Sequence, residues 1–145
     1  DLLAIRVGDV RNLKVGDSFT LREKKTAKIR RITINRSVHV SVQRLLVARP
    51  NAVDTDYLFA SSRTGNRLTV STLNKKVKNW CRQINLPENY GSHTLRKTWG
   101  YMMRTQHGID LPTLMTVYNH ATQRQTLGYL GIQEADVQEC YLREI

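Results

Sequence analysis

The chain has 145 residues, of which 40% are hydrophobic, and its 23 Lys and Arg exceed its 12 Asp and Glu to give a formal net charge of +11. This length suits one domain, and the hydrophobic content supports a core, which excludes wholesale disorder. The positive charge favours a polyanionic partner such as nucleic acid over a merely basic soluble protein, and no run of about 20 apolar residues is present for a membrane span.

The two cysteines, Cys81 and Cys140, are too few and too far apart in the sequence to indicate a disulfide framework or a thiolate metal site. Cys81 lies in a helical pattern, where we expect a reduced and buried side chain. The chain does not open on a signal segment. These features suit a reducing cytoplasm and do not identify a reaction.

The first part of the chain predicts a helix end followed by an antiparallel β-hairpin. The apolar residues from Leu2 to Val7 are interpreted as the tail of a helix. The runs 17–23 and 29–35 have the alternation of strands, and the short polar stretch between them suits a hairpin turn. The charges on the hairpin are mostly basic and include Arg22, Lys24, Lys25, Lys28 and Arg30.

Two helices are predicted in the middle of the chain. The first is capped by Ser37 and reaches Arg49, where Pro50 ends it. After a turn around Gly65, the second helix begins near residues 71–72. The side of this helix that we expect to be buried carries Leu73, Val77, Trp80, Cys81 and Ile84. Its other faces carry Lys75, Lys76, Lys78 and Arg82.

Helical patterns continue to the end of the chain. A third helix spans 94–106 and is stopped by Gly108. Asp110 and Pro112 open a fourth helix, and Thr122 caps a short fifth helix. A last amphipathic segment covers 134–142. Trp99, like Trp80, has apolar neighbours at helical spacing, so both are expected in the core. The predicted fold class is therefore mainly α with a small antiparallel β-hairpin.

Three short motifs in the last third of the chain contain groups suited to phosphate chemistry. His93 and Arg96 are three residues apart at a predicted helix start, so both side chains can point to one side, where the helix N-terminus also favours a phosphate. Such a pair is weak evidence alone. Tyr118-Asn119-His120-Ala121 and Leu127-Gly128-Tyr129 follow it in order.

Together these motifs resemble those of the tyrosine recombinase, or phage integrase, family, and the resemblance extends from Asp1 to the helix after Tyr129. In that family a hairpin lysine, a His-x-x-Arg box, a second His or Trp, and a tyrosine nine residues later form the site. The ordered set with its spacing is specific, although each member alone is not. The matching positions are Lys25, His93, Arg96, His120 and Tyr129.

The resemblance implies the catalytic-domain fold of these DNA breaking-and-rejoining enzymes and a metal-independent transesterification. Tyr129 attacks the phosphorus to give a 3′-phosphotyrosyl link and a free 5′-hydroxyl. The Arg96 guanidinium stabilises charge on the non-bridging oxygens. Lys25, with Lys24 and Lys28 as the alternatives, protonates the leaving oxygen. His93 accepts or relays the tyrosine proton, and His120 hydrogen-bonds a phosphate oxygen.

The family uses a further arginine, which precedes an acidic residue and a leucine, and two registers fit it here. In the favoured register Asp1-Leu2-Leu3 is the acidic segment, so the arginine precedes residue 1. In the other register Arg6 is that arginine. Under the favoured register residues 1–145 are a catalytic domain that is incomplete at its N-terminal side and lacks the core-binding domain, and we expect the chain to bind DNA yet cleave poorly.

The resemblance implies a site-specific recombinase or integrase of a bacterial mobile element or prophage, which acts on DNA in the cytoplasm without a metal or other cofactor. It implies double-stranded DNA as the partner and a homotetramer on DNA, in which segment 134–142 docks on a neighbouring subunit or on its own domain. Two alternatives use the same scaffold: a type IB topoisomerase, which relaxes supercoils without strand exchange, and a catalytically idle DNA-binding module. A generic RNA-binding domain is disfavoured because exposed aromatic clusters are not evident.

Overall fold

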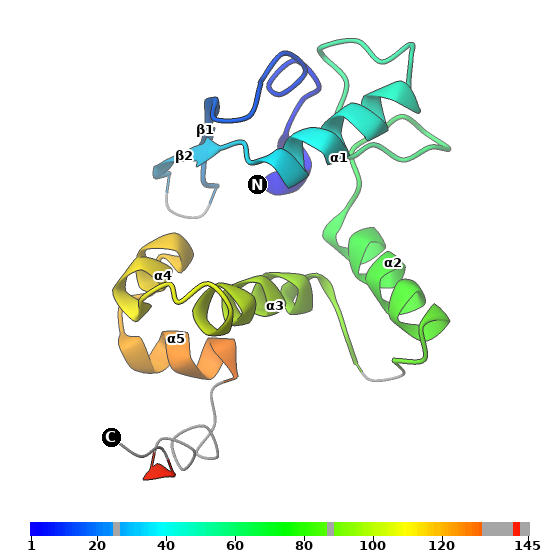
Figure 1. The fold of residues 1–145 in the computed structure, drawn as a ribbon. Helices are drawn as coiled ribbons and strands as arrows, with labels where there is room; N and C mark the ends of the chain where they lie inside the picture. The colour runs from blue at the N-terminus through cyan, green and yellow to red at the C-terminus, as the bar shows by residue number, and fades with distance from the viewer. Residues whose placement is uncertain (25–26, 87–88, 132–140, 143–145) are drawn as a thin grey trace. The chain divides into compact units, whose positions relative to one another are not determined.

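The computed structural model describes residues 1–24, 27–86, 89–131 and 141–142, and it contains two compact units, Asp1–Thr72 and Leu73–Ile145 (Figure 1). These described residues form five α-helices, one short 3-10 helix and one two-stranded antiparallel sheet. The predicted class, mainly α with a small β-hairpin, is confirmed. Within the same residues, no helix is both long enough and apolar enough to cross a membrane.

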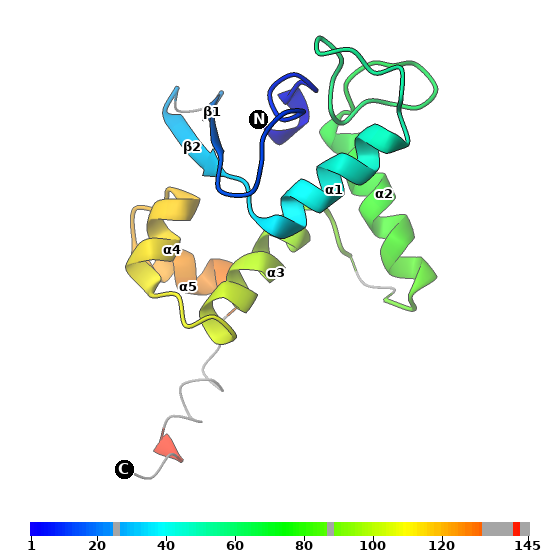
Figure 2. The same cartoon turned by 45° about the horizontal axis from the view of Figure 1, so that its top comes forward.

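The hairpin lies in the first unit, at the predicted place. Strands β1 (Ser18–Arg22) and β2 (Ile29–Thr33) pair antiparallel, with Phe19 opposite Ile32 (Figure 2). Phe19 packs against a core formed by Ile5, Val7, Val10 and Leu58. Residues 25–26, between the two strands in sequence, are not described, so Lys25 lies outside the described residues.

The predicted helix tail at the start of the chain is wrong. Only Leu2–Ala4 (η1) are helical, in a 3-10 turn, and the chain then runs extended through a bridge between Arg6 and Tyr57. The Val7 amide donates to the carbonyl of Asp56, and the Leu58 amide donates to the carbonyl of Ile5, both at 2.9 Å. A distant segment therefore supplies the backbone partners that a helix would have supplied locally.

Helix α1 (Arg36–Val47) starts earlier than expected because its cap is Asn35 and not Ser37. The Asn35 Oδ1 accepts a hydrogen bond from the Val38 amide at 2.9 Å. Asn35 has extended backbone angles, as an N-cap requires, whereas Ser37 already lies in the first helical turn. Both residue types are good caps, so composition alone did not separate them.

The second unit contains most of α2 (Val70–Gln83) and all of α3 (Ser92–Thr105), α4 (Leu111–Tyr118) and α5 (Gln123–Leu130). Helices α3, α4 and α5 pack on one another (Figure 1). Their buried centre consists of Leu114, Tyr118 and Leu130.

The predicted N-caps of α4 and α5 are confirmed. The Asp110 carboxylate accepts from the Thr113 amide at 2.6 Å, and the Thr122 hydroxyl oxygen accepts from the Gln125 amide at 3.2 Å. The first of these hydrogen bonds is the main reason that the pKa of Asp110 is lowered. These caps fix where each helix begins, and so they fix which residues of α5 face α3 and α4.

The predicted burial of both tryptophans is wrong. Trp80 is 51% exposed and Trp99 is 44% exposed, and Ile84, assigned to the same buried side of α2, is 67% exposed. Val77 is buried as expected, while Cys81 is a free thiol that is only partly buried. Helical spacing predicts which residues share a face, but a second element must cover that face before it is buried. Most of segment 134–142 lies outside the described residues.

Candidate active site

Helix α3 begins where the chain turns back toward α2, and this start positions the His-x-x-Arg motif. The Ser92 amide donates to Asn74 Oδ1 at 2.8 Å, which ties the first turn of α3 to α2. The Gly91 amide donates to the Thr94 hydroxyl at 3.0 Å. His93 is exposed in that first turn, and Arg96 follows one turn later.

Tyr118, the last residue of α4, lies at the centre of the site. Its hydroxyl donates to the Arg96 carbonyl at 2.8 Å, and the Arg96 guanidinium carbon lies 4.7 Å from the centroid of its ring. The His120 ring stacks on it with centroids 5.2 Å apart, and the Tyr129 ring packs against it at 5.0 Å with an interplanar angle of 58°. We refer to Tyr118, His120 and Tyr129 as the aromatic cluster.

The position of His120 follows from the end of α4. Asn119 caps that helix in the left-handed conformation, with φ 58°, so the chain reverses and the His120 amide donates to the Met115 carbonyl at 2.9 Å. The His120 Nδ1 lies 3.1 Å from the hydroxyl of Thr126, a fully buried residue of α5. The contact with Thr126 therefore holds the Nδ1 side of the ring against α5. The second ring nitrogen, Nε2, does not take part in this contact.

Burial is the main electrostatic influence on this histidine. Desolvation, followed by the positive charge of Arg96, lowers the pKa of His120. The neutral ring is therefore favoured near pH 7. The Thr126 hydroxyl has one proton. When it donates to Nδ1, the neutral ring carries its proton on Nε2, which can then donate to an anion. When it donates instead to the Thr122 carbonyl at 3.4 Å, Nδ1 carries the proton and Nε2 donates only in the charged ring.

Tyr129 is partly buried on α5 and contacts the site through its ring. The His120 and Tyr129 centroids are 5.2 Å apart at an interplanar angle of 76°, which is an edge-on contact. The Lys97 ammonium lies 5.4 Å from the centroid of the Tyr129 ring. Two positive side chains of α3, Arg96 and Lys97, are thus close to the aromatic cluster.

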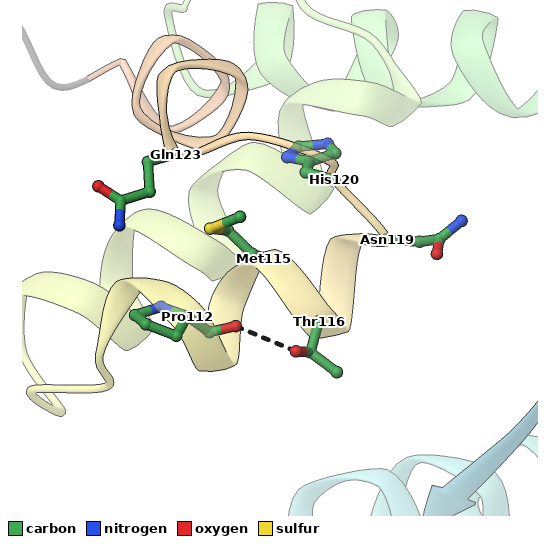
Figure 3. A pocket seen from close by; sticks show the side chains of 6 residues that line it. All are labelled: Pro112, Met115, Thr116, Asn119, His120 and Gln123. Atoms are coloured by element: carbon green, nitrogen blue, oxygen red, sulfur yellow. Dashed lines mark hydrogen bonds between the residues drawn. The ribbon is translucent and has the colours of Figure 1, made fainter.

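His120 also borders an open hollow of about 530 Å³ that runs along α4 (Figure 3). Within this hollow the Thr116 hydroxyl donates to the Pro112 carbonyl at 3.1 Å. The hollow is lined by Pro112, Met115, Thr116, Asn119, His120 and Gln123.

The structure therefore brings three of the five predicted site residues together, namely Arg96, His120 and Tyr129, from α3, the end of α4 and α5. His93 shares the start of α3 with Arg96, but among the described residues no hydrogen bond or ring contact joins it to the aromatic cluster. Lys25 lies outside the described residues. Among the side chains that are described, no group of three or more His, Cys, Asp or Glu could hold a metal ion.

Sequence reasoning gave no role to Tyr118, which the structure places against Arg96, His120 and Tyr129. A weak signal was available, because the aromatic residue is two positions before His120 and Gly100 follows Arg96 by one helical turn. That pattern suggests close packing of a large ring on a glycine, but it does not say which helix meets which.

Arg6, the alternative position for the further arginine, lies in the first unit. Its guanidinium carbon is 3.6 Å from the centroid of the Tyr57 ring, and its Nη1 donates to the Thr55 carbonyl at 2.7 Å. Its amide also donates to the Asp9 carboxylate at 2.7 Å. Both the backbone and the side chain of Arg6 thus make contacts that hold the first unit together.

Comparisons with known proteins identify the family of this chain. Residues 2–135 match the sequence model of the phage integrase family. The chain is 31% identical over 141 residues to the probable integrase/recombinase YoeC of Bacillus subtilis (strain 168), covering 97% of this chain and 74% of that protein.

Solved structures with similar folds include XerA recombinase, with a TM-score of 0.75 and 21% identity over 97% of this chain and 49% of that chain. XerH site-specific recombinase bound to a palindromic difH substrate has a TM-score of 0.70 and 22% identity, over 96% and 39%. The Tn1549 transposon integrase in complex with circular intermediate DNA has a TM-score of 0.63 and 18% identity, over 98% and 54%. This chain therefore spans about half or less of each of these solved chains. By its sequence match, the chain belongs to the phage integrase family.

Proposed function

We propose that this chain is the catalytic part of a site-specific DNA recombinase that cuts and rejoins strands through a 3′-phosphotyrosyl intermediate. The observation that carries the proposal is the meeting of Tyr129, His120 and Arg96 in one cluster built from three helices. A phenol, an imidazole and a guanidinium together provide a nucleophile, a hydrogen-bonding group and a fixed cation for a phosphodiester.

In the proposed reaction, the Tyr129 hydroxyl oxygen forms a bond to the phosphorus while the bond to the 5′-oxygen breaks. The phenol loses its proton and the 5′-oxygen gains one, so the phosphate keeps its charge and becomes a phosphotyrosyl diester. Because the bond energy is retained in that ester, a 5′-hydroxyl can attack it and reseal the strand. No water and no external energy source enter the cycle.

Each remaining residue has a role in this scheme. The Arg96 guanidinium neutralises charge on the non-bridging oxygens, where its planar fork can donate two parallel hydrogen bonds. His120 donates through Nε2 to a phosphate oxygen, while Thr126 holds its Nδ1. His93, exposed at the start of α3, accepts or relays the proton of Tyr129. Lys25 protonates the leaving 5′-oxygen.

We further propose that Arg6 is not the second phosphate clamp. Its guanidinium already rests on the Tyr57 ring and donates to the Thr55 carbonyl, at 2.7 Å. Moving it to a phosphate would break that hydrogen bond and the cation–π contact. The register in which the clamping arginine precedes Asp1 is therefore the one we favour.

The proposed partner is double-stranded DNA, bound mainly through its backbone by a homotetramer. Helix α2 supports this partner because it presents four exposed basic side chains and no acidic ones. XerH and the Tn1549 transposon integrase were each solved with DNA. The basic residues of α2 are Lys75, Lys76, Lys78 and Arg82.

The test uses a nicked duplex from which a short 5′-hydroxyl fragment diffuses away after cleavage, so that resealing fails and the covalent product accumulates. The duplex sequence is taken from the DNA that flanks the protein's own gene. The wild type and its variants are made in the full-length protein, which in the favoured register supplies the clamping arginine upstream of Asp1, because residues 1–145 alone are expected to cleave poorly. We expect a protein–DNA adduct that survives denaturation with this wild type and with Tyr101→Phe, and no adduct with Tyr129→Phe. Tyr101 is a matched control because it lies on α3 and is 43% exposed.

Two other outcomes would redirect the proposal. DNA binding without any adduct would favour a catalytically idle DNA-binding module on the same fold. An adduct combined with relaxation of supercoiled DNA, but without joining of strands from two duplexes, would favour a type IB topoisomerase. Joining of two labelled duplexes, lost in Tyr129→Phe, is the result that a recombinase gives.

The role of Lys25 has a separate test, in which the 5′-bridging oxygen of the scissile phosphate is replaced by sulfur. A thiolate leaves without a proton, because the pKa of a thiol is about 8.5. We expect Lys25→Ala to cleave the oxygen substrate slowly and the sulfur substrate at the wild-type rate. Lys24→Ala and Lys28→Ala are the matched controls on the same hairpin. If one of them shows this rescue instead, that residue is the acid.

A further inference from the structure

We propose that Tyr118 is a positioning residue of this site, which holds the backbone of Arg96 and the ring of His120 in fixed places relative to Tyr129. This inference rests on the proposed function, because it assigns a role within the same site. Tyr118 is 5% exposed, so its own hydroxyl does not reach a DNA strand. Its influence acts through the groups that it touches.

The first observation is the way in which its hydroxyl joins α3. The hydroxyl donates to the Arg96 carbonyl at 2.8 Å, and the buried Gly100 follows Arg96 by one turn of α3. Arg96 and Gly100 are four residues apart, so they are the two ends of one helical hydrogen bond. Tyr118 therefore links the end of α4 to the turn of α3 that begins with Arg96.

The second observation is the space that α3 leaves for this hydroxyl. Gly100 is buried, and a Cβ built there would collide with the Tyr118 hydroxyl and lie 2.7 Å from both Tyr118 Cζ and Leu130 Cδ2. Only glycine at position 100 leaves room for the Tyr118 hydroxyl. A residue that merely filled the core would not need a hydroxyl, since leucine or phenylalanine fills such a space without a polar group to satisfy.

The third observation is the set of side chains that contact the Tyr118 ring. The Arg96 guanidinium carbon lies 4.7 Å from the ring centroid, His120 stacks on the ring at 25°, and Tyr129 packs against it. Trp99 contacts it edge-on with centroids 6.1 Å apart. Removing the ring would free three proposed site groups at once, whereas removing the hydroxyl alone would free only the α3 backbone.

The Tyr118 phenol also stays protonated, so it can donate its hydrogen bond to the Arg96 carbonyl. Burial raises the pKa of Tyr118, Arg96 opposes this shift, and Tyr129 adds to it. Its ring, in turn, covers part of His120 and contributes to the burial that lowers the pKa of that histidine. The charged or titratable groups around His120 are thus Arg96 of α3, Tyr118 of α4 and Tyr129 of α5.

The test compares Tyr118→Phe, which removes only the hydroxyl, with Tyr118→Leu, which also removes the ring, and uses Tyr101→Phe as control. The first readout is the pH titration of the His120 ring by NMR without DNA. We expect Tyr118→Phe and Tyr101→Phe to titrate as the wild type does. Tyr118→Leu should move the His120 pKa upward, toward its ordinary value, because the ring that covers it is gone.

The second readout is the single-turnover rate of adduct formation at saturating concentrations of the nicked duplex. Misplacement of reacting groups by about 1 Å can cost on the order of 100-fold, so we expect a loss of about tenfold in Tyr118→Phe and about 100-fold in Tyr118→Leu. DNA affinity should stay within about twofold, because Tyr118 makes no phosphate contact. The acidic limb of the rate–pH profile should move to higher pH in Tyr118→Leu.

Folded Tyr118→Phe and Tyr118→Leu variants with the wild-type cleavage rate and His120 titration would overturn the proposal. If Tyr118→Leu does not fold, Tyr118→Phe decides, since it keeps the ring: a lower rate supports the proposal, and an unchanged rate contradicts it. If the wild type itself forms no adduct, the proposed function fails. The NMR titration then still tests whether Tyr118 determines the pKa of His120.

Discussion

Replacing Gly100 by alanine tests the close approach of α3 and α4 that builds the site. The added Cβ would overlap the Tyr118 hydroxyl and come within 2.7 Å of Leu130 Cδ2, so the phenol must withdraw and its hydrogen bond to the Arg96 carbonyl must break. Tyr118 and Leu130 are both in the buried centre of the second unit, where neighbouring side chains leave little room for that movement.

The magnitude follows from three contributions. Overpacking of a core costs about 1–3 kcal/mol, and loss of a hydrogen bond costs about 1 kcal/mol. Alanine is favoured over glycine in a helix by about 0.8–1 kcal/mol, which offsets part of this loss. We therefore expect the free energy of unfolding of Gly100→Ala to be lower by about 1–3 kcal/mol.

Urea unfolding followed by tryptophan fluorescence measures this change in the relevant part of the molecule. Both tryptophans of the chain, Trp80 and Trp99, lie in the second unit. With a denaturant slope of about 2 kcal/mol/M, the midpoint should fall by about 0.5–1.5 M. Gly128→Ala is the matched control on α5, because its new Cβ would meet nothing within 4 Å. That variant should gain about 0.5–1 kcal/mol.

A Gly100→Ala variant that is as stable as the wild type, or that gains as much as Gly128→Ala, would refute this reasoning. It would mean that α3 and α4 do not approach closely enough for the Tyr118 hydroxyl to occupy the place of a side chain at position 100.

Three further predictions concern other parts of the second unit. Thr122→Ala removes the N-cap of α5 and should lower the free energy of unfolding by about 1 kcal/mol in the same urea assay, whereas a loss near zero would show that the cap is not formed. The lowered pKa of His120 means that the unfolded chain takes up the proton more readily, so stability is complete above the ordinary value of about 6.5 and declines as pH falls through the folded value. Between about pH 7.5 and about pH 5, the urea midpoint should therefore fall less in His120→Gln than in the wild type. Equal falls in the two proteins would contradict this expectation. Replacing both Lys75 and Lys78 by glutamine should reduce the slope of log affinity for duplex DNA against log salt by about two, and an unchanged slope would exclude α2 from the DNA contact.

Local chemistry made several elements predictable. Asp110 and Thr122 are strong cap residues followed by helical patterns, and both begin helices as expected. Alternation of apolar residues placed both strands of the hairpin to within two residues of their observed ends. In each case the signal and the structure that it forms lie within a few residues of one another.

Tertiary contacts decided the features that were missed. Arg6 pairs with the distant Tyr57 in a bridge that replaces the expected helix tail. Trp80 and Trp99 have the spacing of core residues, yet both are about half exposed. The sequence pattern shows which side chains share a face, whereas burial depends on whether another part of the chain covers that face.

The same division holds for the candidate site. By itself, the sequence determined the family and predicted the reactive groups, because a tyrosine nine residues after His120 and a histidine three residues before Arg96 form a spaced pattern that resembles that family. The tertiary structure decided how those groups are supported. It placed the side chain of Tyr118, at the end of α4, against α3. The absence of a side chain at Gly100 leaves room for the Tyr118 hydroxyl, which donates to the Arg96 carbonyl. That contact joins residues 22 positions apart, and its geometry depends on how three helices pack rather than on any local preference.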